Sequence, residues 1–254
     1  MIILIFFVGL WYFSLFSQTF FQHRYAAHGA FKMNTFWERF FFLFAYITQG
    51  SSYMSPRAYA IMHRMHHAYT DTDKDPHSPS FSSNVFSMMW RTKTIFEGIE
   101  KGTIPIEARF TKNLPEWTGF EKWADSIWSK LLWVLLYVVF FILFANSFWW
   151  YLLLPVIILM GPFHGVLINW FAHKYGYRNF GLKNTSQNLI SIDIFMLGES
   201  YHNNHHKHPS SINFGNRWHE IDPIYHVILF LKRLGIVRIA TPTYTIVRKE
   251  DYNQ

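Results

Sequence analysis

Long apolar stretches dominate the hydrophobic pattern of this chain. Residues 131–173 contain no Asp, Glu, Lys or Arg, and residues 1–22 form a second uncharged apolar stretch. A membrane-spanning helix needs about 20 apolar residues, so the longer stretch can hold two spans and the shorter one can hold one. We therefore predict spanning helices at about 1–22, 129–146 and 148–171, with a hairpin turn at Asn146 and Ser147.

Two shorter segments have an amphipathic or interrupted pattern. In 36–55 the uncharged core FFFLFAYI is too short to span a membrane, so we expect this segment to lie in the interface or to re-enter from one side. The segment DPIYHVILFLKRLG predicts an amphipathic surface helix. Asp222 is its N-cap, Pro223 lies in its first turn and Gly235 ends it after two basic residues.

Composition supports a membrane class. Half of the 254 residues are hydrophobic and 20% are aromatic, which exceeds the need of a soluble domain. We predict a single domain, 1–254, that is an all-α, multi-pass integral membrane protein with about three transmembrane helices and interfacial helices. All 23 Lys and Arg lie in 24–130 or 174–254, so the positive-inside rule places 56–128 and 174–254 in the cytoplasm as a histidine-rich cap. Residues 1–22 lack a basic start and a cleavage site, which favours a spanning helix over a removable signal.

Histidine is the polar residue that stands out against this background. Neutral imidazole is a good ligand for iron, zinc or copper, so clustered histidines predict a metal site. Three motifs hold eight of them: HRYAAH (His23, His28), HRMHH (His63, His66, His67) and HNNHH (His202, His205, His206). On a helix, the i, i+3, i+4 spacing of the last two motifs confines three rings to an arc of about 100°, so each motif can present one face to a common centre.

The first motif has a different spacing. Positions i and i+5 are about 140° apart on a straight helix, so His23 and His28 meet at one point only if the helix ends there. Otherwise the pair reaches two separate metals. A fourth element, NWFAH, holds Asn169 and His173 on one helix face, whereas His164 lies about 180° from His173 and is interpreted as a packed polar residue within the span.

Carboxylates near the motifs could orient a ligating imidazole through its second nitrogen. Asp71, Asp75 and Glu199 are the nearest candidates in sequence, with solvated loop charges as the alternative. The wider set of candidates is Asp73, Asp193, Glu220 and Asp222. His219 and His226 lie outside the motifs and are interpreted as interfacial residues.

Several classes of function lack support. Cysteine is absent, which excludes disulfides, thiolate zinc sites and cysteine-ligated iron–sulfur clusters. The sequence contains no glycine-rich phosphate loop, dinucleotide fingerprint or GxSxG motif. The net charge of +7 follows mainly from the predicted topology; the alternatives are attraction to an anionic lipid surface and steering of an acidic ferredoxin or cytochrome toward the site. No motif supports a nucleic-acid partner.

HRYAAH, HRMHH, NWFAH followed by KYGYR, and HNNHH occur in an order and spacing that resemble the membrane fatty-acid desaturases, specifically their acyl-CoA and delta-9-type branch. The resemblance runs from His23 to about Arg238. It implies two irons, with Asn169 reaching one of them through a water. It also implies that dioxygen serves as co-substrate and that a cis double bond forms in a fatty acyl chain. The implied histidine ligands are His23, His28, His63, His66, His67, His173, His202, His205 and His206.

Physical reasoning supports an amphiphilic substrate independently. A metal centre at the cytoplasmic ends of apolar helices can be reached by a lipid whose tail enters the protein, so we expect an apolar tunnel. An Arg-Asp pair holds the CoA end in the animal members, but Ile61 and Met62 stand at those positions. An acyl chain carried by CoA, by a phospholipid or by a carrier protein therefore remains open.

Two further departures from the family pattern shape the expectations. The chain begins where the animal members have their second spanning helix, so we expect three spans and an outside N-terminus. The haem motif HPGG is absent, because His208 and Pro209 are followed by Ser210 and Ser211. The electron donor is then expected to be a separate protein, such as ferredoxin or cytochrome b5 with its reductase.

Two alternative functions involve other chemistry. A membrane hydroxylase or ketolase uses the same histidine pattern to insert oxygen into a lipid or alkane. A metal transporter would place ionisable residues along the buried midplane, whereas here the uncharged hairpin holds only His164 well inside it.

Overall fold

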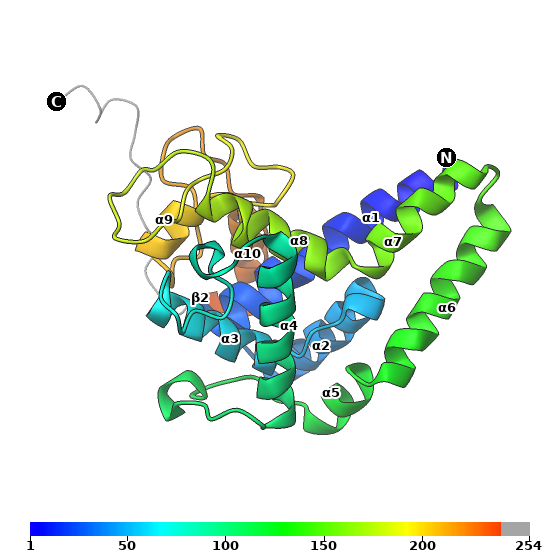
Figure 1. Ribbon diagram of the computed structural model, residues 1–254, viewed down its shortest axis with the longest axis horizontal. Helices are drawn as coiled ribbons and strands as arrows, with labels where there is room; N and C mark the ends of the chain where they lie inside the picture. Colours follow the sequence, from blue (N-terminus) through cyan, green and yellow to red (C-terminus); the bar gives the residue numbers. More distant parts are fainter. Residues whose placement is uncertain (240–254) are drawn as a thin grey trace.

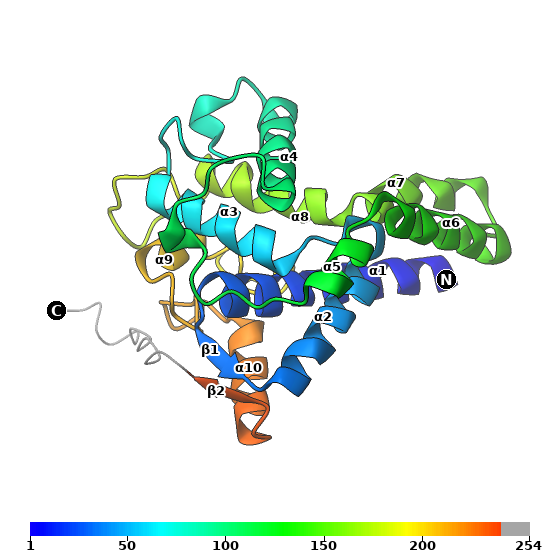
Figure 2. The same ribbon diagram turned by 90° about the horizontal axis from the view of Figure 1, so that it is seen from below.

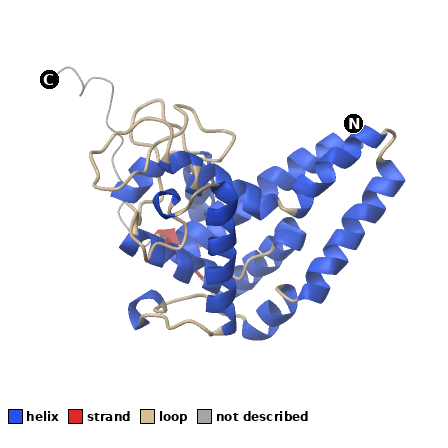
Figure 3. Cartoon of the chain, viewed as in Figure 1, coloured by secondary structure: helices blue, strands red, loops and turns tan. Residues whose placement is uncertain are grey.

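The computed structural model describes residues 1–239, and this part of the chain is mainly helical, with long loops between some of the helices (Figures 1 and 3). The predicted domain and its cytoplasmic segment include 240–254, which lie outside the described residues. The α-helices are α1 (Ile2–Phe16), α2 (Thr35–Gln49), α3 (Pro56–Tyr69), α4 (Val85–Lys101), α5 (Thr118–Ala124), α6 (Ile127–Phe144), α7 (Leu154–Ile158), α8 (Met160–Asn169), α9 (His202–Lys207) and α10 (Pro223–Arg233). The predicted all-α class is confirmed, with one small ribbon in addition: β1 (Phe31–Met33) pairs with β2 (Val237–Ile239) in antiparallel register.

Short helices of other types join these elements. The π-helix η1 (Ser17–Ala27) continues α1 without a break. The 3-10 turns are η2 (Gly50–Ser52), η3 (Pro79–Phe81), η4 (Ala108–Phe110), η5 (Phe148–Leu153) and η6 (Phe171–His173).

Two helices are long and apolar enough to cross a membrane. They are Ile2–Ala27, which is α1 with η1, and Ile127–Phe144, which is α6. The third predicted span is divided into Phe148–Ile158 and Met160–His173, which meet at an angle of 66°; counted as one broken span, they give three in total. The prediction of about three spans is therefore confirmed, but its third member is bent.

The bend has a local cause. Pro162 has no N–H to donate to the carbonyl of Ile158 four residues earlier, so that carbonyl is free at the break. The hydroxyls of Ser51 and Ser52 each donate a hydrogen bond to it, both at 2.9 Å. The η2 turn thus stabilises the bend in the apolar hairpin.

The predicted short segment at 36–55 forms α2 and then turns sharply. The helix begins at Asn34, whose side chain accepts from the N–H of Trp37, and it ends at Gly50. Gly50 has φ +53°, and a Cβ at this position would collide with the Tyr137 hydroxyl of α6. Only glycine therefore permits this turn and the close approach of α6.

The C-terminal surface helix is confirmed as α10. Asp222 caps it by accepting from the N–H of Tyr225, and Gly235, with φ +72°, follows the helix end. Viewed from two directions, the N-terminal end of α1 extends to one side of the molecule with α6 and α7 (Figures 1 and 2). The helices α3 and α9, which carry HRMHH and HNNHH, lie at the opposite side.

Candidate metal centre

The π-helix explains the spacing of the first histidine motif. In a π-helix the backbone N–H bonds to the carbonyl five residues earlier, which stacks residue i+5 over residue i. The N–H of His28 donates to the carbonyl of His23 at 3.1 Å, and His28 is also the residue at which this helix ends. Both rings therefore belong to one group, and the alternative that the pair divides between two metals is wrong.

The other motifs each contribute to two groups. A five-histidine group brings together ring nitrogens from η1, α3 and α9, and a four-histidine group brings together rings from α3, η6 and α9. The five-histidine group is His23, His28, His63, His67 and His205, and the four-histidine group is His66, His173, His202 and His206. In α3, His63 and His67 belong to the five-histidine group and His66 belongs to the four-histidine group. The three rings of one motif are therefore divided between the two groups.

The nitrogens in each group have the separation expected of ligands on one ion. The Nε2 atom of His67 lies 3.0 Å from that of His63 and 2.8 Å from that of His205. In the four-histidine group, the Nε2 atom of His202 lies 2.9 Å from that of His173 and 3.1 Å from that of His206. Two nitrogens at right angles on a metal with bonds of about 2.1 Å lie about 3 Å apart. A cation between them would also remove the repulsion among convergent lone pairs, so both groups fit a bound metal.

Burial keeps these rings neutral and able to coordinate. His202 and His205 are 2% and 1% exposed. Burial lowers the pKa of His202, His205 and His206 well below the ordinary histidine value, and the surrounding histidines lower it further. A neutral imidazole with its Nδ1 hydrogen engaged elsewhere presents an Nε2 lone pair to a metal.

Two of the predicted orienting carboxylates contact the second nitrogen of a clustered ring. Asp75 is fully buried, and its two oxygens lie 2.9 and 3.0 Å from Nδ1 of His66. Glu199 Oε2 lies 2.8 Å from Nδ1 of His23. Although burial acts to raise the pKa of Glu199, His23 and Arg24 hold it below the ordinary value. Both carboxylates can therefore fix the tautomer and the direction of the ring that they touch.

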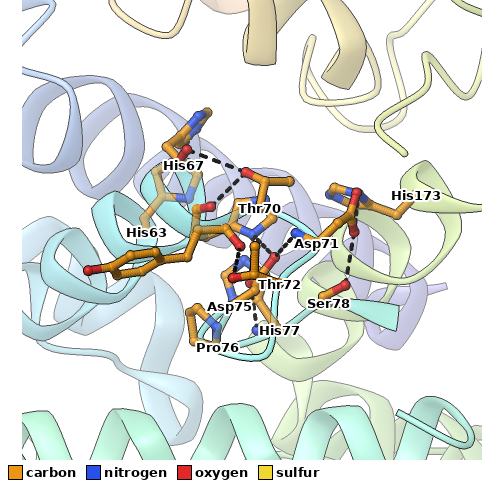
Figure 4. Close-up of polar contacts among 12 residues, drawn as sticks. His63, His67, Thr70, Asp71, Thr72, Asp75, Pro76, His77, Ser78 and His173 are labelled. Atoms are coloured by element: carbon orange, nitrogen blue, oxygen red, sulfur yellow. Dashed lines mark hydrogen bonds and ion pairs between the residues drawn. The ribbon is translucent and has the colours of Figure 1, made fainter. Parts of the chain in front are cut away.

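Asp71 makes no hydrogen bond to a ring of the two histidine groups. It accepts from the N–H of Thr185 at 2.6 Å and from the hydroxyl of Ser78 at 2.9 Å, while Nδ1 of His173 lies 4.0 Å away. The hydroxyl of Thr185 is the closer partner of His173, at 3.0 Å. Figure 4 shows this loop after α3, with Asp71 between Ser78 and His173.

The remaining acidic candidates serve other structural roles. Asp193 accepts backbone N–H groups of its own loop, and Glu220 accepts from Tyr177 and Asn204. Asp222 pairs with Arg24 at 2.8 Å in addition to capping α10. Asp73 is exposed. These four carboxylates lie outside the groups of candidate metal ligands.

Sequence reasoning missed Arg24 and His77. Arg24 is fully buried at the end of an otherwise uncharged helix, where it pairs with Glu199 at 3.2 Å and with Asp222. Its presence inside HRYAAH was the available signal. His77 is 2% exposed, its ring centroid lies 4.2 Å from that of His66, and it joins His66 and Asp75 in a third group that could hold a metal.

Two cavities that share lining residues lie near the histidines. The α4 cavity, of about 540 Å³, lies along α4, η2 and α8 and is mainly apolar; its lining includes Phe86, Trp90 and Gly161. An inner cavity of about 40 Å³ is lined by His23, His63 and His202. Asn169 lines both cavities. His164 is buried against Trp11 as a packed residue of the bent hairpin, with ring centroids 4.6 Å apart, and it also lines the inner cavity.

A helical membrane protein with two buried groups of convergent histidines is the class that this fold and site define. The model of the fatty acid desaturase family matches residues 1–231, so the chain belongs to that family, whose members are oxidoreductases.

Its similarity to curated proteins agrees with this membership. The chain is 30% identical over 229 residues to Delta-9 desaturase-like 5 protein of Arabidopsis thaliana, covering 87% of this chain and 70% of that protein. It is 29% identical to Delta-9 acyl-lipid desaturase 1 of the same organism, covering 84% and 67%. It is 28% identical to sn-1 stearoyl-lipid 9-desaturase of Synechocystis sp., covering 85% and 64%.

Proposed function

We propose that this protein introduces a cis double bond into a saturated fatty acyl chain at a di-iron centre. The reaction consumes one dioxygen, two electrons and two protons, and it converts a pair of adjacent methylenes into an alkene with release of two waters. The observation that carries the proposal is the convergence of nine histidine rings in two adjacent groups. The five-histidine group and the four-histidine group would each hold one iron, with Asn169 reaching one of them through a water.

The bound irons would supply the dioxygen chemistry that removes two hydrogen atoms from the substrate. The chain's own contribution is to orient the rings and to exclude water. Asp75 and Glu199 hold the rings of His66 and His23 through Nδ1. The apolar helices around the site keep the reacting carbons dry, which protects them from side reactions.

The α4 cavity is the proposed path of the acyl chain. Its volume lies in the range of sites that enclose a small ligand. Gln18, Tyr59, Met62 and Gly165 line both this cavity and the inner cavity, so a chain entering along α4 would arrive beside the histidines. The rim includes Phe86 and Trp90, which are 83% and 70% exposed and would face lipid.

A membrane lipid is the acyl carrier that this cavity favours. Coenzyme A carries several phosphate charges and needs free cations, but Lys93 pairs with Glu97 and Lys130 lies 2.5 Å from Asp125. Ile61 is buried in a hydrophobic cluster, and Met62 lines the α4 cavity. Two of the relatives are named as acyl-lipid or stearoyl-lipid enzymes. We also propose that the histidines lie on the cytoplasmic side of a multi-pass protein, where a separate protein would donate electrons; the distribution of Lys and Arg supports this orientation.

Product analysis tests the proposal. The protein is expressed in a host of defined lipid content with an electron donor, and iron and fatty-acid methyl esters are measured in the same preparation. We expect about two irons per chain and a new monounsaturated ester in the lipid fraction. A hydroxylated product would identify an oxygenase, and labile zinc without product would identify a transporter. Either result overturns the desaturase proposal.

Narrowing the α4 cavity provides a second test. A Cβ on Gly165 would lie 3.7 Å from Met89 and 3.8 Å from the amide nitrogen of Asn169, so a small side chain fits. Because Gly165 lines the α4 cavity, a large side chain at this position would narrow it. We expect Gly165→Leu to lower desaturation about tenfold or more, while iron content stays unchanged and Gly165→Ala remains close to wild type. Equal activity of the Leu and Ala variants would contradict this acyl path.

A further inference from the structure

A third cavity, which we call the basic cavity, opens beside the histidine groups on a wall away from α4. Its volume is about 770 Å³, and four cations contribute to its lining: Lys32, Arg64, Arg109 and Lys112. Glu38 is the acidic residue among its described lining residues, and it accepts a hydrogen bond from Tyr25. The cavity therefore carries a positive charge excess.

Cations around this cavity lie close to one another, which is electrostatically unfavourable. The ribbon places Lys32 opposite Arg238, and both side chains are exposed. Like charges that face each other across two strands repel. Arg109 is paired with Glu107 at 2.9 Å, but the ion pairs found among residues 1–239 include neither Lys32 nor Lys112. An anionic partner would relieve this repulsion.

Arg64 connects the basic cavity to the first histidine motif. Its guanidinium donates to the carbonyls of Ala26 and Ala27 in η1 and to those of Phe110 and Lys112 in the opposite loop. The wall that carries Lys112 is thereby held against the end of the π-helix. A partner bound to this wall would contact a rigid surface.

His28 forms part of the same wall. His28 is a half-buried residue that lines the basic cavity, whereas His23 and His205 are buried and are not among its lining residues. The centroid of the His28 ring lies 4.8 Å from those of both His63 and His205. A partner in the basic cavity would therefore approach the five-histidine group with one imidazole between them.

We infer that the basic cavity and the Lys32–Arg238 ribbon form the docking site of an acidic electron-carrier protein, with His28 as the ring nearest the carrier. This inference rests on the proposed function, which consumes two electrons in each turnover. An iron–sulfur or haem protein supplies them one at a time, so two reduced carriers are oxidised for each double bond. Because the α4 cavity lies along other elements, carrier and acyl chain can bind together.

Binding of an oxidised carrier tests this surface without requiring turnover. The probes are an acidic [2Fe–2S] ferredoxin and the soluble haem domain of cytochrome b5, titrated against the iron-loaded protein in lipid nanodiscs. The variants are Lys32→Glu, Lys112→Glu and the double substitution. The control is Lys122→Glu, at an exposed position on α5 outside the basic cavity, which changes the net charge by the same amount as each single substitution.

We expect the double variant to bind at least one carrier about tenfold or more weakly, with a smaller dependence on salt, while Lys122→Glu stays within about twofold of wild type. In a single turnover, in which the irons are reduced with dithionite, the dithionite is removed and dioxygen is then added, all variants should form the same amount of double bond. Equal carrier binding by the double variant and the control would overturn the docking surface alone.

Two other outcomes separate the alternatives. If the double variant loses affinity for phosphatidylglycerol vesicles but not for the carriers, the basic face binds lipid headgroups and the inference is wrong. If the wild-type protein forms no double bond with dithionite, the proposed function fails, whether or not the carriers bind.

Discussion

Asp75 connects the loop after α3 to the four-histidine group. It is fully buried, and it accepts from the backbone N–H groups of Asp71 and His77 while facing His66. The loop therefore orients the carboxylate, and the carboxylate orients the ring. This arrangement makes the loop sequence part of the candidate metal site, although the loop provides no ring to the four-histidine group.

Replacing this carboxylate should weaken metal binding without removing a ring of the four-histidine group. We expect Asp75→Asn to lower iron affinity about 10- to 100-fold, because the amide loses the charge that holds the tautomer of His66. Competition with a chelator measures the affinity. Asp73→Asn, at an exposed position of the same loop, should bind iron as the wild type does. Equal affinities for the two variants would contradict the orienting role.

Arg24 shows how one residue can carry two structural roles. It links Glu199, which contacts His23, to Asp222, which caps α10. An unpaired charge in such a buried position is costly, so the two carboxylates and the arginine stabilise one another. The residue spacing predicted the Asp222 cap, but it could not predict that a residue nearly 200 positions earlier shares this carboxylate.

At the scale of elements, the π-helix is the feature on which the first motif depends. The two histidines are five residues apart, which an α-helix separates by about 140° and a π-helix aligns. Deleting Ala26 would leave a four-residue spacing, which an α-helix also keeps on one face. Inserting an alanine after Ala26 would separate the rings in either geometry.

These two changes in length should therefore have unequal effects. We expect the insertion to reduce iron bound at the five-histidine group about tenfold or more, because one ligand is lost, while the deletion retains most of it. Iron content after purification and competition with a chelator measure the difference. The same loss in both variants would show that chain length, and not ring alignment, governs the site.

The turn between α2 and η2 is a second element-scale feature with a measurable contribution. Gly50→Ala should lower the free energy of unfolding by at least about 2 kcal/mol, because alanine is strained at φ +53° and its Cβ would collide with Tyr137. Thermal unfolding in detergent measures this change in stability. Gly119 in α5 has open space around it, so Gly119→Ala should leave the protein equally or slightly more stable. Equal stability of the two variants would contradict the requirement for glycine at position 50.

On the scale of the whole molecule, the two histidine groups join segments that are distant in sequence. The five-histidine group connects η1, α3 and α9, and the four-histidine group connects α3, η6 and α9. A ligand that binds only the folded state stabilises it in proportion to the logarithm of its concentration over its dissociation constant. Bound metal should therefore stabilise the entire arrangement of helices.

Removal of metal should lower the unfolding temperature. We expect chelation to reduce the midpoint of the iron-loaded protein by about 10 °C, which corresponds to a few kcal/mol for a chain of this size. Scanning fluorimetry of the loaded, chelated and reloaded protein measures this. If the chelated and loaded forms unfold at the same temperature, the histidine groups do not hold a stabilising ion.

Local patterns determined much of this protein. Apolar length predicted the spans, capping residues predicted α10, and the spacing of histidines predicted which rings share a helix face. These features depend on residues within a few turns of one another. The family resemblance likewise depended on motifs that are each only a few residues long.

Only the tertiary structure decided how those faces meet. It divided each HxxHH motif between two groups, aligned His23 with His28 through a π-helix, and bent the third span so that Ser51 and Ser52 meet the carbonyl of Ile158. It also buried Arg24 between two carboxylates and placed His28 beside the basic cavity. Such contacts join positions up to about 200 residues apart, and they depend on how all the helices pack, which local periodicity does not specify.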